Sequence, residues 1–394
     1  MKVIYVSSLV SQSKMNDIIR KSKKKPLQSI QKFHRLLCEG LAKNGVDVKA
    51  ISSIPMSRDI SNGIMWFDKK QSINGVEYNY IPFINFKVLR QLSTFIGTLI
   101  MATKECIKER KEKVFICDIL NTTIASTTLI LSKIFKIKCI AIVTDLPRDI
   151  GGKLSISRKI NEKLQGKYDA YIILTKAMNN VVNKKNKPFI IIEGIADTNM
   201  KQKENNIENK YKEKVCIYAG GLYEKYGVKN LVEAFKQLKQ DNIRLHIYGT
   251  GELEDYLNKI NDNRIKYFGV VENEKIVEEE MKATLLINPR FSREEYTKYS
   301  FPSKNMEYMS TGTPVLTTKL PGIPEEYYQY IYCIDDESVD GIKNALTNVL
   351  NRPIEELQKK GEEAKKFVLE NKNNMIQTEK IIEFLRRKIT NEKI

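Results

Sequence analysis

Several residue patterns that identify common classes of protein are missing from this chain of 394 residues. It has only two histidines, His34 and His246, and its six cysteines include no Cys-x-x-Cys pair, so neither zinc nor another His- or Cys-held metal is expected. No run of 18 apolar residues is present, which argues against a membrane-spanning helix. The chain opens directly on an apolar run without a signal-like segment, and a cytoplasmic location is therefore expected.

Three nucleotide-binding signatures are also absent. No Gly-x-x-x-x-Gly-Lys-Ser/Thr loop occurs, which excludes a P-loop enzyme. Gly249 and Gly251 begin a dinucleotide fingerprint, but Glu254 stands where its third glycine would be, so NAD binding is poorly supported. No Asp-x-Asp occurs, so a metal-held nucleotide sugar is not supported either.

The charge, in contrast, is large and uneven. Residues 1–200 hold 34 basic and 16 acidic residues, which accounts for the whole net charge of +18. The densest basic run lies in an expected loop and consists of Arg20, Lys21, Lys23, Lys24 and Lys25. Such a surface attracts anionic lipid or a polyanionic substrate, although a solvated lysine-rich face is the plain alternative. Nucleic acid is not expected as a partner, because no aromatic residues interleave with the run.

Short β-branched runs alternate with helical patterns along most of the chain. A strand over 2–6 precedes an amphipathic helix over 28–44, and a hairpin is expected where runs 64–67 and 76–82 flank Asn74-Gly75. Because strands that alternate with helices form parallel sheets, we predict an α/β fold of two Rossmann-like, doubly wound domains that face each other across a cleft.

Composition suggests where these domains end. The polar segment 196–213 is expected to connect an N-terminal domain over 1–195 with a C-terminal domain over 214–375. A final helix within 376–394 is expected to pack back toward the N-terminal domain.

The stretch from Lys298 to Tyr327 carries the main functional pattern. Pro302 and Ser303 mark a helix start, with Ser303 as the expected N-cap, and free N–H groups there can bind a phosphate. Lys304 adds positive charge at that end, and Glu307 follows about 6 Å further along the helix, where it could accept bonds from ribose hydroxyls. This spacing favours a nucleotide diphosphate, although an ordinary surface helix would show the same residues.

Two further loops follow expected strands. Gly220-Gly221 would let the backbone approach a ligand, and Lys225 could reach an anion. Asp145 follows a strand of the first half and is a weaker candidate, since an aspartate before Pro147 is equally typical of a turn. His34 is better explained as a structural histidine within its helix.

These segments resemble the family 4 glycosyltransferases of GT-B fold, of the type that builds bacterial surface polysaccharides. The resemblance is carried by "IYAGGLYEKYGVKNLVEAF", "LHIYGTGELEDYL", "IKYFGVV", "LLINPR" and above all "FPSKNMEYMSTGTPVLTTKLPGIPEE". In the first half it is looser and rests on "QKFHRLLCEGLAKNGVDVKAIS", "VTDLP" and "YDAYIILTKAMN".

The resemblance implies transfer of a sugar from a nucleotide diphosphate sugar to a hydroxyl, with retention at the anomeric carbon and with neither a bound cofactor nor a metal. The family's pair of glutamates would fall on Tyr299 and Glu307, and a family arginine would fall on Gly221, so Lys225 or Arg290 could supply the missing charge. The catalytic candidates are Lys304, Arg290 and Asp145. The donor-binding candidates are Gly220, Gly221, Lys225, Phe268, Val270, Tyr299, Ser300, Phe301, Ser303, Lys304 and Glu307.

The resemblance also implies that the domain over 1–195 lies on the acceptor side and that the domain over 214–375 binds the donor. The acceptor is expected to be a glycan or a lipid-linked sugar, with the basic N-terminal domain on an anionic membrane surface at the inner face of the membrane. Three alternatives share some of these features. A nucleotide-sugar 2-epimerase of the same fold needs no acceptor, a non-catalytic basic binding protein would explain the substitutions at Tyr299 and Gly221, and a nucleic-acid binder would explain the net charge.

Overall fold

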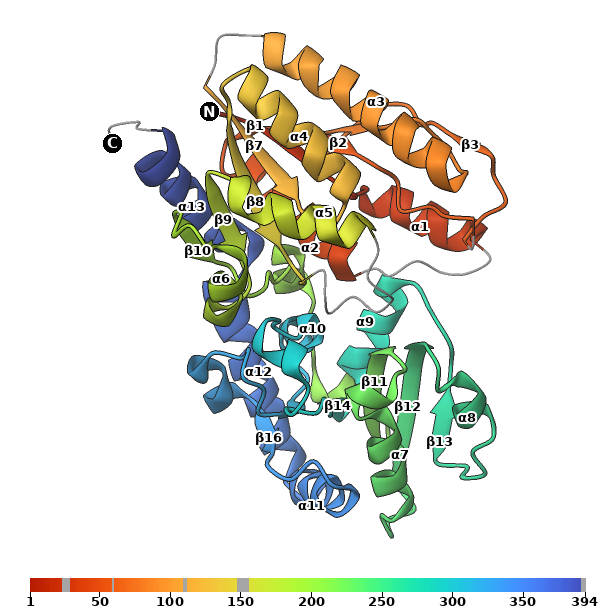
Figure 1. Cartoon of the computed structure of the whole chain (residues 1–394). Coiled ribbons are helices and arrows are strands. Elements are labelled where there is room, and N and C mark those ends of the chain that lie inside the picture. Colours follow the sequence, from red (N-terminus) through yellow and green to blue (C-terminus); the bar gives the residue numbers. More distant parts are fainter. Residues whose placement is uncertain (23–28, 59, 109–111, 147–155, 391–394) are drawn as a thin grey trace. The chain divides into compact units, whose positions relative to one another are not determined.

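The chain folds into two compact units, each built on its own parallel sheet (Figure 1). The computed structural model describes residues 1–22, 29–58, 60–108, 112–146 and 156–390, so Lys23, Lys24 and Lys25 of the basic run lie outside the described residues. The first unit comprises Met1–Ile195 with Asn374–Ile394, and the second comprises Ala196–Asn373. Among the described residues, no helix combines the length and the apolar character needed to cross a bilayer.

The first unit contains an eight-stranded sheet in the order β10-β9-β8-β7-β1-β2-β5-β4, in which only β4 is antiparallel to its neighbour. Its strands are β1 (Lys2–Ser7), β2 (Asp47–Ser52), β4 (Gln71–Ile73), β5 (Val76–Tyr80), β7 (Lys113–Asp118), β8 (Lys138–Val143), β9 (Ala170–Ile173) and β10 (Phe189–Ile191). Its helices are α1 (Gln12–Lys21), α2 (Ser29–Lys43), α3 (Lys87–Ile107), α4 (Thr122–Ile134), α5 (Ile156–Leu164), α6 (Lys176–Val182) and α13 (Asn374–Leu385).

Helices cover both faces of this sheet, because alternate residues of its central strands are buried on opposite sides. Val3 and Tyr5 of β1 pack with Leu37 of α2 and Ile381 of α13 in one core cluster. Helices α3, α4 and α5 lie side by side over the sheet (Figure 1). This layered arrangement is the doubly wound α/β architecture predicted from the alternation of strands and helices.

The expected hairpin exists, but one of its strands was predicted wrongly. Across the Asn74-Gly75 turn, β5 pairs with β4, and the run 64–67 contributes instead β3 (Met65–Trp66). Strand β3 pairs antiparallel with β6 (Phe83–Ile84) as a separate ribbon. The tight two-residue turn decided the register, because the strand that pairs with β5 must end directly before Asn74.

The second unit contains a six-stranded, wholly parallel sheet in the order β13-β12-β11-β14-β15-β16. Its strands are β11 (Lys214–Gly221), β12 (Ile243–Thr250), β13 (Ile265–Tyr267), β14 (Leu285–Asn288), β15 (Val315–Thr318) and β16 (Tyr332–Ile334). Its helices are α7 (Val228–Lys236), α8 (Glu254–Asn258), α9 (Asn273–Lys282), α10 (Ser303–Thr311), α11 (Val339–Leu350) and α12 (Ile354–Asn371). One core cluster joins the sheet to α7 and α11, and another joins it to α9, α10 and α12.

The segment expected to be a connector is packed into the second unit. It forms two short 3-10 helices, η2 (Thr198–Gln202) and η3 (Ile207–Asn209). The Lys210 ammonium donates hydrogen bonds to the carbonyl oxygens of Met281 and Ala283, at 2.8 and 2.9 Å, and to the hydroxyl of Thr313, at 3.0 Å. A cation placed at the C-terminal end of α9 satisfies carbonyl groups that the helix leaves free.

Helix α13 is held against α2 by close backbone contact, which makes Gly40 a sensitive position. A Cβ atom at Gly40 would overlap the backbone carbonyl oxygen of Asn374. We expect Gly40→Ala to lower the free energy of unfolding by about 1–3 kcal/mol, because neither helix backbone can give way. Urea denaturation would measure the loss. Gly166→Ala is the matched control, since its Cβ would lie 3.6 Å from Cε of Lys185, which is an ordinary van der Waals contact. Equal losses in both variants would contradict this account.

Candidate functional site

Two loops of the second unit meet at the point where the strand order of its sheet reverses. Strands β11 and β14 are parallel neighbours, so the loops that follow them leave from the same edge. Gly227 ends the first loop with a φ of +72°, and any side chain there would overlap the carbonyl oxygen of Pro289 in the second loop. In open α/β sheets such a reversal leaves a crevice at the carboxyl ends of the strands, where ligands bind.

Helix α10 points its N-terminus at this edge, and its start differs from the prediction by one residue. Pro302 is the N-cap and Ser303 is the first helical residue, with no side-chain hydrogen bond across the cap, so the prediction of Ser303 as N-cap was wrong. Pro302 has no N–H to satisfy and its backbone is extended, which suits it to this position. Ser303 is exposed beside the first N–H groups of the helix.

A buried ring of side chains fixes the start of α10 against the sheet. The Asn288 amide donates to Oδ1 of Asn305 at 2.8 Å, and the Asn305 amide donates to the hydroxyl of Thr317 at 3.3 Å. The Thr317 hydroxyl closes the ring by donating to the carbonyl oxygen of Asn288 at 3.1 Å. The first turn of α10 is thus tied to the ends of β14 and β15, and Lys304 is placed by this anchor.

Lys304 lies over the first loop rather than in open solvent. Its ammonium donates a hydrogen bond to the Tyr218 hydroxyl at 2.6 Å and lies 3.9 Å from the centre of that ring. A Cβ atom at Gly220, where φ is +152°, would overlap the end of the Lys304 side chain. Burial, followed by the nearby Arg290 guanidinium, lowers the pKa of Lys304 well below its usual value. An arriving anion would stabilise the charged form of this lysine.

Three cations gather around the ring of Tyr226. The guanidinium carbon of Arg290 lies 4.6 Å from the ring centre, Nζ of Lys225 lies at 5.5 Å and Nζ of Lys304 lies at 5.8 Å. Tyr296 takes part as well, since its ring centre is 5.4 Å from Nζ of Lys225 and 5.7 Å from the Arg290 guanidinium. The structure thus brings together Lys225, Arg290 and Lys304, which the sequence placed on three separate segments.

The tyrosines explain the glycine that stands where the family resemblance expected arginine. A Cβ atom at Gly221 would lie 2.9 Å from the Tyr226 ring and 3.0 Å from the Tyr223 ring, so a longer side chain has no room. Arg290 supplies a guanidinium against Tyr226 instead, and its buried Nε has no hydrogen-bond partner among the described residues. The roles of Tyr218, Tyr226 and Tyr296 were missed in the sequence, although three tyrosines within nine residues of "YAGGLYEKYG" offered a signal.

Glu307 lies one turn into α10 and is half-buried. The Asn273 side-chain amide, at the first residue of α9, donates a hydrogen bond to its carboxylate at 3.1 Å. Asn273 was not predicted, because its contact depends on the crossing of α9 and α10. The carboxylate therefore stands oriented beside the cation cluster, with oxygen lone pairs that can accept further hydrogen bonds.

The residues just before α10 have unequal access to a ligand. The Tyr299 hydroxyl lies 3.2 Å from a carboxylate oxygen of Glu295, which brings an acid next to the position where the resemblance expected one. Ser300 donates from its hydroxyl to the carbonyl oxygen of Tyr296 at 3.2 Å. The Phe301 side chain is buried against Tyr327, with ring centres 5.1 Å apart, which leaves only its backbone for a ligand.

Phe268 and Val270 follow β13 at the same edge of the sheet. The Phe268 ring is 45% exposed and stacks on Tyr248, with ring centres 4.8 Å apart. Val270 is half-buried beyond Gly269. An exposed aromatic face at this place offers a surface on which a flat ring can stack.

Two candidates belong to the first unit and are not placed relative to the cation cluster. Asp145 is half-buried directly after β8, and Pro147 lies outside the described residues. His34 is fully buried, and its Nδ1 is 2.6 Å from the Tyr5 hydroxyl, as expected of a structural histidine. Burial lowers the pKa of His34. In the described ranges, no three His, Cys, Asp or Glu side chains form a group that could hold a metal ion.

The Tyr226 ring is expected to stabilise the unit by lying among three positive charges. We expect Tyr226→Leu to lower the free energy of unfolding by about 1–3 kcal/mol, and Tyr226→Phe, which keeps the ring, to lose much less. Added salt should restore part of the stability of the leucine variant, since it screens repulsion among the cations. Urea denaturation at two salt concentrations tests this, with Tyr223→Leu as the control. Equal, salt-independent losses in the Phe and Leu variants would contradict it.

Comparison with known proteins finds a family that is similar to most of the second unit and a fold that is shared over the whole chain. Residues 199–367 match the family described as glycosyl transferases group 1, whereas no curated protein sequence matches the chain. Sucrose-phosphate synthase from Thermosynechococcus elongatus is similar in structure, with a TM-score of 0.72 at 14% identity over 100% of both chains.

Two further solved structures show the same similarity. The α,α-trehalose 6-phosphate synthase from Burkholderia multivorans has a TM-score of 0.65 at 10% identity over 98% of both chains. Anabaena HepE in complex with UDP has a TM-score of 0.64 at 12% identity over 98% of this chain and 99% of that one. The chain therefore shares the GT-B fold of these structures, and its residues 199–367 are similar to the glycosyl transferases of group 1.

Proposed function

We propose that this protein transfers a sugar from a nucleotide diphosphate sugar to a hydroxyl group, with retention at the anomeric carbon. The observation that carries the proposal is the cluster of Lys225, Arg290 and Lys304 around Tyr226, at the reversal of a parallel sheet. A diphosphate is the leaving group of such a donor and needs positive charge in a confined place. The group 1 domain and the UDP held by the structurally similar Anabaena protein support this reading.

The parts of the donor have separate binding places in this proposal. The diphosphate lies between the cation cluster and the first N–H groups of α10, where the helix dipole adds to the attraction. The ribose hydroxyls donate hydrogen bonds to Glu307, which Asn273 holds in place. The base stacks on the exposed face of Phe268.

The chemical step breaks the bond between the anomeric carbon and the diphosphate oxygen. Negative charge then accumulates on the diphosphate, and the cations stabilise it without moving. The acceptor oxygen attacks the anomeric carbon from the face that the diphosphate leaves, and its proton passes to a phosphate oxygen. Three protein cations supply the positive charge that the leaving group needs, so we propose that no metal ion takes part.

The acceptor belongs to the same proposal. We infer that it is a glycan or a lipid-linked sugar in the assembly of a cell-surface polysaccharide or glycolipid, and that the protein works at an anionic membrane surface. The excess of 34 basic over 16 acidic residues in 1–200 supports the membrane contact, since each basic residue near such a surface contributes about 1 kcal/mol.

Inorganic pyrophosphate and nucleoside diphosphates together separate the roles of Lys304 and Glu307. We expect Glu307→Ala to weaken binding of the preferred nucleoside diphosphate by roughly tenfold to hundredfold and to leave pyrophosphate binding unchanged, because this carboxylate meets only the ribose. Lys304→Met should weaken both ligands. Calorimetric titration with UDP, GDP, ADP and CMP, with and without magnesium, measures this. The proposal fails if none of these ligands binds to the wild-type protein.

The lowered pKa of Lys304 makes binding depend on pH. In the free protein the ammonium loses its proton below the usual lysine range, and a bound diphosphate raises its pKa again. Affinity should therefore fall as pH rises through the interval between these two values, with uptake of a proton on binding. Calorimetry in two buffers of different ionisation enthalpy measures the uptake. Proton uptake should vanish in Lys304→Arg and persist in the control Lys239→Arg. If it persists in Lys304→Arg, another group takes up the proton.

A further inference from the structure

Helix α3 of the first unit exposes a face that is mostly apolar. Its exposed positions include six large apolar side chains, of which Val88 is 73% exposed and Ile107 is 69% exposed; the others are Leu89, Leu92, Ile96 and Ile100. A helix on the surface of a globular protein normally turns polar and charged residues outward. The outer side of α3 thus has the composition of a face that is covered by something.

The apolar surface continues beyond the start of this helix. Phe67 is 74% exposed, and Ile64 and Met65 next to it are also exposed. Strand β3 pairs with β6, which runs almost directly into α3, and the Asn85 N–H donates to the carbonyl oxygen of Ile64 at 2.7 Å. We call the exposed apolar residues of 64–67 together with those of α3 the α3 face.

Another long helix of the same protein shows the contrast. The exposed positions of α12 are all polar, and all but Asn371 are charged: Glu355, Glu356, Lys359, Glu362, Glu363, Lys366, Glu370 and Asn371. The two helices are similar in length, and only α3 turns large apolar side chains outward. The α3 face is therefore a local feature and does not reflect a generally apolar surface.

The exposed charges on α3 itself are positive. The remaining exposed positions of α3 are Lys87, Gln91 and Lys104, and its C-cap residue Lys108 is exposed as well; none of them is acidic. Lysines at both ends of the helix can lay their apolar stems along the surface and extend their ammonium groups beyond it.

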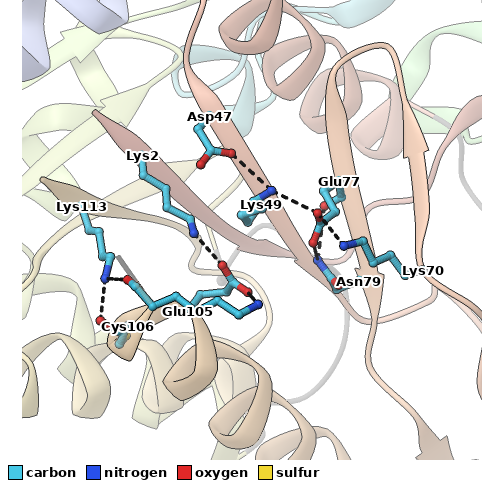
Figure 2. A network of polar contacts seen from close by, with 10 residues as sticks. Lys2, Asp47, Lys49, Lys70, Glu77, Asn79, Glu105, Cys106 and Lys113 are labelled. Carbon is cyan, nitrogen blue, oxygen red and sulfur yellow. Dashed lines mark hydrogen bonds and ion pairs between the residues drawn. The ribbon is translucent and has the colours of Figure 1, made fainter. Parts of the chain in front are cut away.

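Nearby acids are already engaged by other lysines (Figure 2). Glu105 pairs with Lys2 at 2.7 Å and with Lys108 at 2.8 Å. Glu77 pairs with Lys70 at 2.6 Å and Lys49 at 3.0 Å, and despite partial burial these bonds lower its pKa to about 2. Asp68 pairs with Lys14. These carboxylates are neutralised by their partners, which leaves the region with a positive field.

We propose that the α3 face docks on an anionic lipid bilayer, with α3 lying in the plane of the interface. The apolar side chains enter the boundary between headgroups and acyl chains, and the lysines contact lipid phosphates. A second copy of this chain is a poorer occupant, because it would bring lysines against lysines. This inference rests on the membrane contact of the proposed function and not on the donor site.

Binding to vesicles of defined composition tests the proposal. The full chain should co-sediment with vesicles of equal parts phosphatidylcholine and phosphatidylglycerol, and much less with phosphatidylcholine alone. Leu92→Glu/Ile96→Glu/Ile100→Glu should weaken binding to the anionic vesicles by more than about tenfold, since it removes three apolar anchors and adds three repelled charges. Lys87→Gln/Lys104→Gln should weaken it less and reduce its dependence on salt.

Control variants keep this test apart from that of the donor site. Ile207→Glu replaces an exposed apolar residue of the second unit and should leave vesicle binding unchanged. All variants should bind nucleoside diphosphates as the wild type does. Loss of vesicle binding and loss of donor binding can therefore be observed independently of each other. The proposal is overturned if the wild type ignores anionic vesicles, if the triple variant binds them as well as wild type, or if ultracentrifugation shows a dimer that the triple variant abolishes.

Discussion

The parallel pairing of β11 with β14 is the constraint on which the candidate site depends. Parallel strands end at the same edge, and here the neighbours in space are separated in sequence by two strand–helix repeats. Their two loops therefore meet, close enough that only a glycine at 227 fits against the carbonyl oxygen of Pro289. Every cation of the site reaches the same place because of this one pairing, with α10 contributing Lys304 from the adjacent connection.

Gathering three cations has an electrostatic cost that the surrounding residues must offset. The rings of Tyr218, Tyr226 and Tyr296 lie against the cations, and their negative faces offset part of the repulsion among them. Gly221 makes this arrangement possible, because the rings of Tyr226 and Tyr223 occupy the space that a side chain at 221 would take. Part of the electrostatic cost remains at Lys304, where burial and the nearby Arg290 destabilise the ammonium and lower its pKa. A bound anion would stabilise the charged form again.

The first unit handles charge in the opposite way. Near α3 the carboxylates of Glu105, Asp68 and Glu77 are paired with lysines, and exposed lysines and large apolar side chains lie together on the helix. Such a surface is unfavourable in water, since apolar area stays hydrated while like charges repel. The apolar side chains and the lysines would both be stabilised against an anionic lipid bilayer, which is apolar inside and negatively charged at its surface. In the proposals made above, the second unit binds the donor and the first unit contacts the membrane.

The sequence by itself determined the α/β class, the parallel sheets, the turn at Asn74-Gly75 and a helix start near Lys304, because these follow from local periodicity and residue type. Only the tertiary structure decided which segments meet. Asn273 donates a hydrogen bond to Glu307, and Arg290 packs against the ring of Tyr226. Strand β5 pairs with β4 and not with the run 64–67. The packing of segments 196–213 and α13 likewise depends on long-range contacts such as that of Gly40 with Asn374. Strand order and helix crossing are set by the burial of whole faces, which no short stretch of residues encodes.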